Sequence, residues 1–152
     1  MSEPRPSFDP RRAVQLISGR GHSGWLGLRY CDHGDDWVEL ELPWRQDLLA
    51  EEGGKVLASG PILSLMDMAS GMAIWRAMAE FSAIATLDLR VDYVRPAREG
   101  ASVFGRSQCY RVTRSAAFVR GFAHDGDPDD PVAHIQGAFM KIISHAAMGQ
   151  DG

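Results

Sequence analysis

The sequence lacks the features by which membrane, secreted and nucleic-acid-binding proteins are usually recognised. It contains no run of about 18 apolar residues that would span a bilayer. Residues 1–10 are polar and proline-rich, without the apolar core of a signal peptide. The formal net charge of -4 gives no general affinity for nucleic acid or anionic lipid. Together these absences predict a cytoplasmic protein that uses neither a membrane nor nucleic acid as a partner.

Residues that bind metals or form disulfides are also scarce. The only cysteines, Cys31 and Cys109, stand far apart and outside any Cys-x-x-Cys motif, which favours two reduced thiols. The five histidines are scattered along the chain, without the spacing of metal ligands. We therefore expect no metal site.

The length and composition of the chain indicate a single folded domain. With 152 residues, of which 45% are hydrophobic and 24% charged, the chain is long enough to bury a core and ordinary in polarity. No internal repeat divides it. We predict a disordered leader over residues 1–9, one domain over residues 10–144 and a flexible tail over residues 145–152.

The first part of the domain is predicted to contain a short helix, a hairpin and a loop. The segment 10–19 has helical character and ends at a glycine. In the segment 37–42, apolar residues alternate with glutamate, as in a strand with one polar face. This strand is predicted to form a hairpin with the segment 25–31. The segment 43–60 has no clear period and is predicted to be a loop.

The segment 61–79 predicts one long buried helix. Pro61 suits the first turn of a helix, where its missing N–H is not needed. The remaining residues are mostly Ala, Leu and Met, and a helix that is apolar on nearly all sides is a buried helix. Its polar side chains are Ser64, Asp67, Ser70 and Arg76.

Four segments of alternating polarity follow this helix and predict antiparallel strands. In the first of them, the alternation predicts that Thr86 lies on the opposite face of the strand from Leu87, Leu89 and Tyr93. The order of elements predicts an α+β fold. The four segments are 83–95, 101–113, 115–124 and 132–144.

Each of the last three predicted strands has a glycine near its centre. These residues are Gly105, Gly121 and Gly137. Glycine inside a strand often marks a sharp bend or a close backbone approach. We expect the three to form a row across the sheet, where the sheet curls around the buried helix. The alternative is three unrelated bulges.

Asp67 is the only acid in the predicted helix and the main candidate for chemistry. Because burying an unpaired carboxylate is costly, such an acid is paired, neutral or next to a cavity. Its neighbours one turn away include Ser64, Ser70 and Gly71. These small residues predict that Asp67 forms one wall of a pocket. The alternative is an acid paired with an arginine such as Arg90, or hydrogen-bonded to Ser64 and Ser70.

The residues Ala58-Ser59-Gly60-Pro61 are a second candidate feature. They stand at the start of the predicted helix, where the first-turn N–H groups lack intrahelical partners and the helix dipole adds positive potential. Such N–H groups can hold a carbonyl oxygen that gains negative charge. The alternative is that Ser59 simply caps the helix.

Taken together, the stretch from Gly60 to Gly71 and the stretch from Ala85 to Ala97 resemble the hotdog-fold acyl-CoA thioesterases of the PaaI-like type. In that family a His-Gly-Gly motif opens the central helix, and an Asp or Glu follows nine residues after the histidine. A later strand has a Ser or Thr near its start and ends in Tyr-x-x-Pro. The resemblance covers roughly residues 38–143.

The family motif falls on particular residues of this chain. The histidine position is Ala58, and Asp67 stands nine residues after it. Thr86 occupies the Ser/Thr position, and Tyr93 to Pro96 matches the end of the strand.

This resemblance implies a fold, an activity and an assembly. One antiparallel sheet would wrap around the helix 61–79, and homodimers or homotetramers would hold active sites between subunits. The activity would be hydrolysis of an acyl-CoA thioester, with Asp67 as general base or nucleophile. The N–H groups of Ser59 and Gly60 would polarise the thioester carbonyl, and Thr86 would steady the water. No cofactor is implied beyond the coenzyme A of the substrate itself.

Further residues are predicted to bind the substrate. Ser64, Ser70 and Gly71 surround the acid, while Arg111 and Arg114 flank a turn and are candidates for the phosphates of coenzyme A. Apolar surface for the acyl group is expected from the helix and from Leu87, Leu89 and Phe118.

The sequence also departs from the family pattern. Ala58 replaces the histidine, and residues 51–54 contain no Asn or Gln at the place where an amide often contacts substrate in this family. These differences leave open a hotdog protein that binds acyl-CoA with little or no hydrolysis. A hotdog hydratase is disfavoured, because its histidine five residues after the aspartate is Met72 here.

Overall fold

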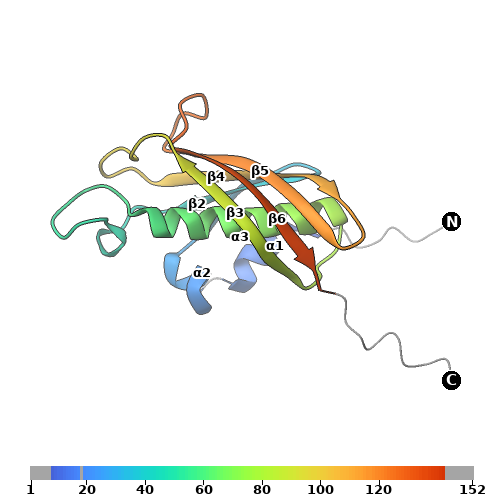
Figure 1. The fold of residues 1–152 in the computed structure, drawn as a ribbon. Helices are drawn as coiled ribbons and strands as arrows, with labels where there is room; N and C mark the ends of the chain where they lie inside the picture. The colour runs from blue at the N-terminus through green and yellow to red at the C-terminus, as the bar shows by residue number, and fades with distance from the viewer. Residues whose placement is uncertain (1–7, 18, 143–152) are drawn as a thin grey trace, which may run out of the picture.

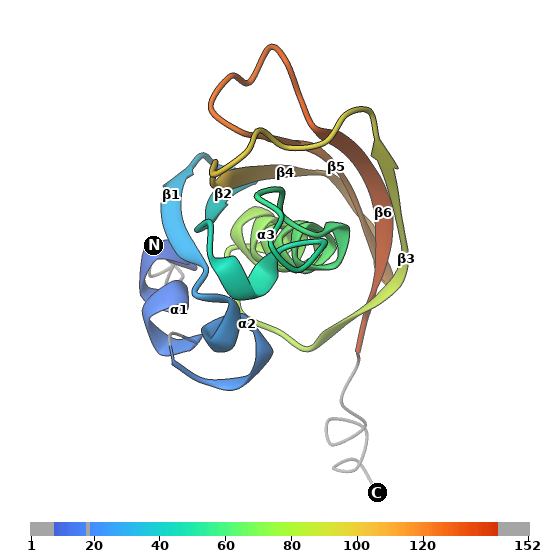
Figure 2. The ribbon, with the colours of Figure 1, turned by 90° about the vertical axis from the view of Figure 1, so that its left-hand side faces the viewer.

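In the computed structural model, which describes residues 8–17 and 19–142, one antiparallel sheet wraps around one long helix (Figures 1 and 2). The strand order is β1-β2-β4-β5-β6-β3, and every neighbouring pair is antiparallel. This arrangement confirms the predicted α+β hotdog fold. Most of the predicted leader 1–9 and all of the predicted tail 145–152 lie outside the described residues.

The elements follow the predicted order along the chain, with differences at their ends. The helices are α1 Pro10–Ile17, α2 Gly21–Leu26 and α3 Ser59–Met78, with a 3-10 turn η1 at Gln46–Leu48. The strands are β1 Arg29–His33, β2 Trp37–Leu42, β3 Ile84–Tyr93, β4 Val103–Val112, β5 Ala116–His124 and β6 Ala133–Lys141.

The first strand is shorter than predicted, because α2 takes up the start of the segment 25–31. Gly27 ends α2 with a left-handed backbone conformation (φ 71°), which a glycine adopts without steric cost. The chain therefore enters β1 only at Arg29. The predicted loop 43–60 is also partly wrong, since it contains η1 and the first two residues of α3.

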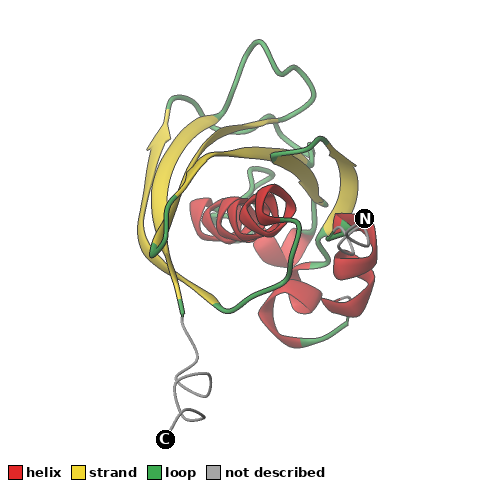
Figure 3. Ribbon diagram, turned by 90° about the vertical axis from the view of Figure 1, so that its right-hand side faces the viewer, coloured by secondary structure: helices red, strands yellow, loops and turns green. Residues whose placement is uncertain are grey.

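Helix α3 forms the centre of the core. Its residues Leu65, Met66, Ala69 and Ala73 are completely buried and face the concave side of the sheet. Figure 3 shows the sheet curling around α3, while the short helices α1 and α2 lie beside the helix near the β1 edge. The apolarity of α3 therefore reflects contact with the sheet on one side and with the short helices on part of the other. Within the described ranges, no helix is long and apolar enough to cross a membrane.

A β-bulge in β3 changes which side chains face the helix. The pairing of β3 with β6 shifts register between Thr86 and Asp88, so that Leu87 is an extra residue and is 62% exposed. Beyond the bulge, Leu89 faces inward opposite Gly137, and Thr86 faces inward opposite Phe139. The prediction that Thr86 lies on the other face from Leu89 is therefore wrong.

The three strand glycines form a staggered line and not the predicted row. Gly105 pairs with Ala123, and Gly121 pairs with Ile135, so each glycine is two residues out of line with the next. Only Gly105 meets the helix, because a Cβ there would lie 2.7 Å from the sulfur of Met66. A Cβ on Gly121 or Gly137 would instead meet the backbone of a neighbouring strand.

A buried carboxylate joins the two loops beside the start of α3. Asp125 has a fully buried side chain and accepts two hydrogen bonds of 2.8 Å from the guanidinium of Arg95. It also accepts a bond of 2.8 Å from the backbone N–H of Arg98. These donors, above all Arg95, hold the pKa of Asp125 well below its ordinary value. The β3–β4 and β5–β6 loops are thereby held together.

Candidate active site

Asp67 lies half-buried on α3 and contacts the edge strand β3. Its carboxylate accepts a hydrogen bond of 2.7 Å from the hydroxyl of Thr86. This contact exists because the bulge at Leu87 turns Thr86 inward. Among the described residues, no basic side chain forms an ion pair with Asp67, and Arg90 instead pairs with Asp92. The alternative of an arginine-paired acid is therefore wrong.

The start of α3 leaves backbone donors without a side-chain cap. Ala58 is the N-cap residue, and no side chain in the described part of the chain makes a capping hydrogen bond there. The proposed capping role of Ser59 is therefore wrong. Ser59 and Gly60 are both exposed, and their N–H groups belong to the first turn, which has no intrahelical partners for them.

Tyr93 holds this helix start against β3. Its hydroxyl donates a hydrogen bond of 2.9 Å to the carbonyl oxygen of Ser59. Burial raises the pKa of Tyr93, which keeps the hydroxyl protonated as a donor. Strand β3 therefore makes two polar contacts with α3, one at Ser59 and one at Asp67.

One side of α3 remains accessible, and we call it the open strip. It consists of Gly60, Leu63, Ser64 and Asp67, which recur at helical spacing and are all partly or fully exposed. Thr86 of β3 borders the strip on one side. His22 of α2 borders it on the other, where its Nε2 lies 2.9 Å from the hydroxyl of Ser64.

Two of the predicted substrate-binding residues face away from the open strip or are covered. Ser70 is completely buried, and its hydroxyl is 2.9 Å from that of Ser107 in β4. Gly71 is also buried, and a Cβ on it would make ordinary contact with Ile84 at 3.6 Å. The side chain of Ile84 therefore lies beside Gly71. The alternative in which Asp67 is hydrogen-bonded to Ser64 and Ser70 is wrong as well, because both hydroxyls have other partners.

Phe118, Arg111 and Arg114 lie away from the acid, whereas Leu87 directly follows Thr86, which contacts the acid. Phe118 lies on the outer face of the sheet, where its ring packs 6.5 Å from that of Tyr110, so it cannot line a pocket beside α3. Leu87 is the exposed bulge residue. Arg111 and Arg114 are exposed around the β4–β5 turn, toward the end of α3 opposite to its start.

Two hollows lie close to α3 on the inner side of the sheet. The first, of about 450 Å³, is beside the helix start and is bordered by Ser59, Ile62 and Tyr93. The second, of about 770 Å³, runs between α1 and α3. Its walls are mainly apolar and include Phe8, Leu16, Met68, Met72, Trp75 and Phe81. Met68 directly follows Asp67 in the sequence, but Asp67 itself does not line this groove.

Comparison with known proteins places the chain in a family. The sequence profile described as Thioesterase superfamily matches residues 54–132. A protein of Halobacterium salinarum described as a proposed esterase is 34% identical over 143 residues, which is 87% of this chain and 94% of that protein. The chain belongs to the thioesterase superfamily. The matched segment contains α3, β3 and both polar contacts between them.

Solved structures agree with this membership. A Pseudomonas aeruginosa protein of known crystal structure is 36% identical, with a TM-score of 0.75 over 87% of this chain and 96% of that one. The PaaI protein of the Escherichia coli phenylacetic acid degradation operon is 15% identical, with a TM-score of 0.73 over 87% of this chain and 91% of that one. At that identity, the PaaI likeness supports the hotdog fold alone.

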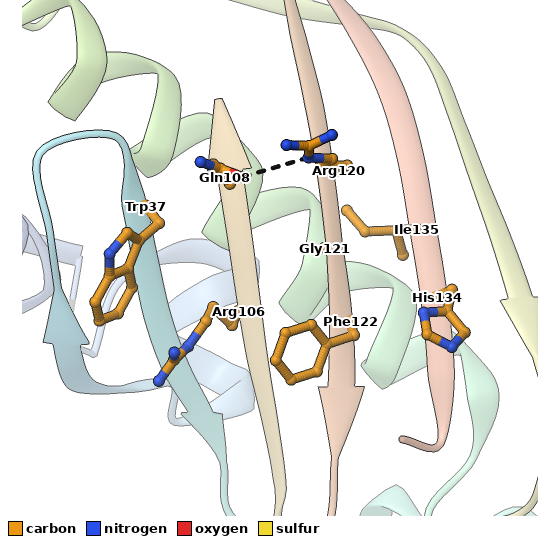
Figure 4. Close-up of a pocket in the computed structure, with 8 residues that line it drawn as sticks. All are labelled: Trp37, Arg106, Gln108, Arg120, Gly121, Phe122, His134 and Ile135. Atoms are coloured by element: carbon orange, nitrogen blue, oxygen red, sulfur yellow. Dashed lines mark hydrogen bonds between the residues drawn. The ribbon is translucent and has the colours of Figure 1, made fainter. Parts of the chain in front are cut away.

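A further hollow on the outer face of the sheet is separate from the superfamily site. Figure 4 shows that Trp37, Arg106 and Phe122 stand on the face of the strands away from α3. The hollow measures about 460 Å³ and is lined by Trp37, Arg106, Phe122 and other residues of β2, β4, β5 and β6. Arg106 is already bonded to Glu39 at 3.0 Å, and none of the predicted site residues lies there.

Two residues of the site were not among the sequence-predicted candidates. Tyr93 could have been found, because it belongs to the Tyr-x-x-Pro end that the superfamily strand shares. His22 had no such signal, since it precedes the matched segment by more than thirty residues and meets Ser64 only through the packing of α2.

Proposed function

We propose that the protein hydrolyses an acyl-CoA thioester to a free acid and coenzyme A. The observation that carries this proposal is the Asp67 carboxylate, which is half-buried on the open strip and held by the Thr86 hydroxyl at 2.7 Å. One carboxylate oxygen is positioned by Thr86, which leaves the other to accept a proton from water. A positioned general base of this kind typically contributes about 10²- to 10⁴-fold to a rate.

In the proposed reaction, Asp67 takes a proton from a water molecule as the water oxygen attacks the thioester carbon. The carbonyl oxygen becomes negatively charged and is held by the uncapped N–H groups of Ser59 and Gly60 at a helix start. The tetrahedral intermediate then collapses with loss of the thiolate. In the alternative route, Asp67 attacks the carbonyl carbon directly and forms an anhydride. This route uses the same carboxylate and the same N–H donors.

The donors and the acid of one chain are too far apart to serve one carbonyl. Gly60 and Asp67 are seven residues apart in α3, or about 10 Å at 1.5 Å per residue. A reacting group must lie within about 3 Å of both. A complete site therefore requires the helix start of a second copy near Asp67, which supports a homodimer as the unit of the predicted dimer or tetramer.

The edge strand β3 suits this assembly. It ends the strand order, so one side of its backbone is available for pairing with another chain. On its outer face Asp88 and Arg90 stand two residues apart, and antiparallel pairing centred on Leu89 would place these opposite charges across from each other. The same pairing brings Tyr93, bonded to a helix start, toward the Thr86 end of the other strand.

The groove between α1 and α3 is proposed to take the acyl group. Its walls include Met68, the residue after Asp67, and combine methionines with the aromatic rings of Trp75 and Phe81, whose centroids are 4.6 Å apart. Apolar pockets of this size accept aromatic or medium-length acyl groups. Methionine side chains adapt to more than one shape.

A binding protein without hydrolase activity is the second candidate. Ala58 at the helix start provides no side-chain donor, and residues 51–54 supply no amide. Losing one oxyanion donor costs about 10²- to 10³-fold elsewhere. The fold, the groove and the dimer would then hold an acyl-CoA without turning it over.

The two candidates are separated by measuring free-thiol release from a panel of aromatic and medium-chain acyl-CoAs. Hydrolysis by the wild type and a loss of about 10³-fold in Asp67→Asn are expected. Asp129→Asn, the same change on an exposed loop acid, is the matched control and should retain full activity. Equal, slow rates for wild type and Asp67→Asn, with binding of acyl-CoA retained, would instead establish the binding protein.

The assembly is tested by multi-angle light scattering over a range of protein concentrations. A dimer or tetramer is expected. A monomer at all concentrations that still hydrolyses acyl-CoA would contradict the site shared between two copies.

A further inference from the structure

We propose that Ser64 and His22 form a proton-donating pair that serves the leaving thiolate at the Asp67 site. This inference rests on the hydrolase function proposed above and adds two residues to it. Ser64 is the residue that would contact the substrate sulfur, and His22 is the positioning residue behind it.

The geometry of the pair comes from two separate helices. α2 carries His22 to the border of the open strip, where its Nε2 is 2.9 Å from the Ser64 hydroxyl. Ser64 is three residues before Asp67 on α3, so their Cβ atoms are about 5–6 Å apart. Thr86 approaches Asp67 from the opposite side. The acid and the hydroxyl therefore face the same region of the strip from adjacent turns.

Ser70 provides a contrast within the same helix. Its hydroxyl also has a partner at 2.9 Å, but that partner is Ser107 and both side chains are completely buried. Ser64 is only half-buried, and His22 is exposed. A ligand on the open strip can therefore reach Ser64, while solvent can exchange protons with the imidazole.

The pair also supplies a histidine to a site whose helix start has none. The position before Ser59 is Ala58, and α2 lies outside the segment 54–132 that matches the superfamily. His22 therefore reaches the site by a route that the matched segment does not contain.

The proposed step balances protons and electrons. After water has attacked, with its proton taken by Asp67, the C–S bond breaks and its electron pair moves to sulfur. The Ser64 hydroxyl gives its proton to that sulfur, while His22, which acts in its imidazolium form, gives its Nε2 proton to the Ser64 oxygen and becomes neutral imidazole. The exposed imidazole regains a proton from solvent, and Asp67 releases the proton that it took. The net reaction consumes one water molecule.

A change of leaving group tests this assignment. Hydrolysis of an acyl-CoA releases an alkyl thiolate, which needs a proton. Hydrolysis of the thiophenol ester of the same acid releases an aryl thiolate, which is stable without one. His22→Gln and Ser64→Ala are each expected to lower kcat on acyl-CoA by about 10- to 100-fold. On the thiophenol ester, the loss should be less than about 3-fold. Asp67→Asn should slow both substrates to a similar degree.

Two further measurements separate proton donation from a structural role. The double variant should be no slower than either single variant, because both act in one step. Added imidazole should restore part of the activity of His22→Ala, since the site is exposed. His134→Gln, which changes an exposed histidine on the outer face of the sheet, is the control and should match the wild type.

Several outcomes would overturn the assignment. Equal losses on both thioesters, or an acyl group found on Ser64 by mass spectrometry, would refute proton donation while leaving the hydrolase function in place. Absence of thiol release by the wild type from either substrate would refute the hydrolase function, and the pair with it.

Discussion

The two sides of α3 use the same kinds of polar side chain for different purposes. Facing the sheet, Ser70 is sealed against Ser107. On the open strip six residues earlier, Ser64 makes a bond of the same length to the exposed His22. A buried hydroxyl that loses its hydrogen-bond partner lowers the free energy of unfolding. An accessible hydroxyl can replace its partner with water or a ligand. Stability and chemistry are thus divided between the two sides of one helix.

The two notable carboxylates of the molecule show the same division. Asp125 has a fully buried side chain whose oxygens accept bonds from Arg95 and Arg98. Asp67 is half-buried and accepts one hydroxyl hydrogen bond, from Thr86. The carboxylate of Asp125 uses its hydrogen bonds to join two loops. The carboxylate of Asp67 can still accept hydrogen bonds from water or a ligand.

The largest expected effect is on stability, in Asp125→Asn. Removing this charge leaves the guanidinium of Arg95 without its buried counterpart, which typically costs about 3–5 kcal/mol of unfolding free energy. Urea unfolding at pH 7 measures this loss. Asp129→Asn, on the exposed part of the same loop, should remain within about 0.5 kcal/mol of the wild type.

The effect of pH on Asp125 sharpens the same test. The pKa of Asp125 is lower in the folded protein than in the unfolded chain. Its contribution to the free energy of unfolding is therefore fully present above the ordinary aspartate pKa of about 3.9, and it is lost as the pH falls through the folded-state pKa. The wild type should therefore lose stability below about pH 4. Asp125→Asn should lose less over that range, and identical pH profiles would contradict the assignment.

A smaller effect, on activity and not on stability, is expected for Thr86→Val. The variant keeps the shape of the side chain but removes the hydroxyl that bonds to Asp67, and because Thr86 is exposed, water can replace that hydroxyl at little cost in stability. If the bond positions Asp67 for reaction, kcat for an acyl-CoA should fall by about 10- to 100-fold. Thermal unfolding should change little.

Ser70→Ala is the counterpart on the sealed side. It leaves the buried hydroxyl of Ser107 without its partner, so the unfolding free energy should fall by about 1–3 kcal/mol while kcat is unchanged. If Thr86→Val and Ser70→Ala gave the same pattern of losses, the proposed division between the two sides of α3 would be wrong.

The smallest effect is expected for Tyr93→Phe. This change removes the bond from the Tyr93 hydroxyl to the Ser59 carbonyl, a net contribution of about 0.5–1.5 kcal/mol. The helix start would be held less firmly, and kcat should fall by about 2- to 10-fold with KM nearly unchanged. Phe104→Leu, an apolar change on the outer face of the sheet, should leave kcat unaltered.

Much of the architecture was predictable because its signals are local. The apolar composition of α3 and the alternation in β2 to β6 reflect periods of a few residues. Asp67 and Thr86 were both predicted, and the structure joins them. The bulge at Leu87 was not predicted, because strict alternation assumes that no residue is added to the strand. That extra residue is what turns Thr86 toward Asp67.

The glycines and the serines show where such prediction fails. Gly105, Gly121 and Gly137 occupy similar places in their own strands, but strand register offsets them from one another. Ser64 and Ser70 are equivalent in the sequence as small polar neighbours of Asp67. The position of the sheet relative to α3 is what buries the hydroxyl of Ser70 and leaves that of Ser64 accessible.

By itself, the sequence determined the long apolar helix with a single acid, the strands that surround it and the nine-residue spacing from Ala58 to Asp67. These are properties of short segments, and helix and strand periods express them directly. The tertiary structure alone decided that Thr86 turns inward and that His22 reaches Ser64. Such relations depend on register, on a bulge and on the packing of distant elements, which no local pattern contains.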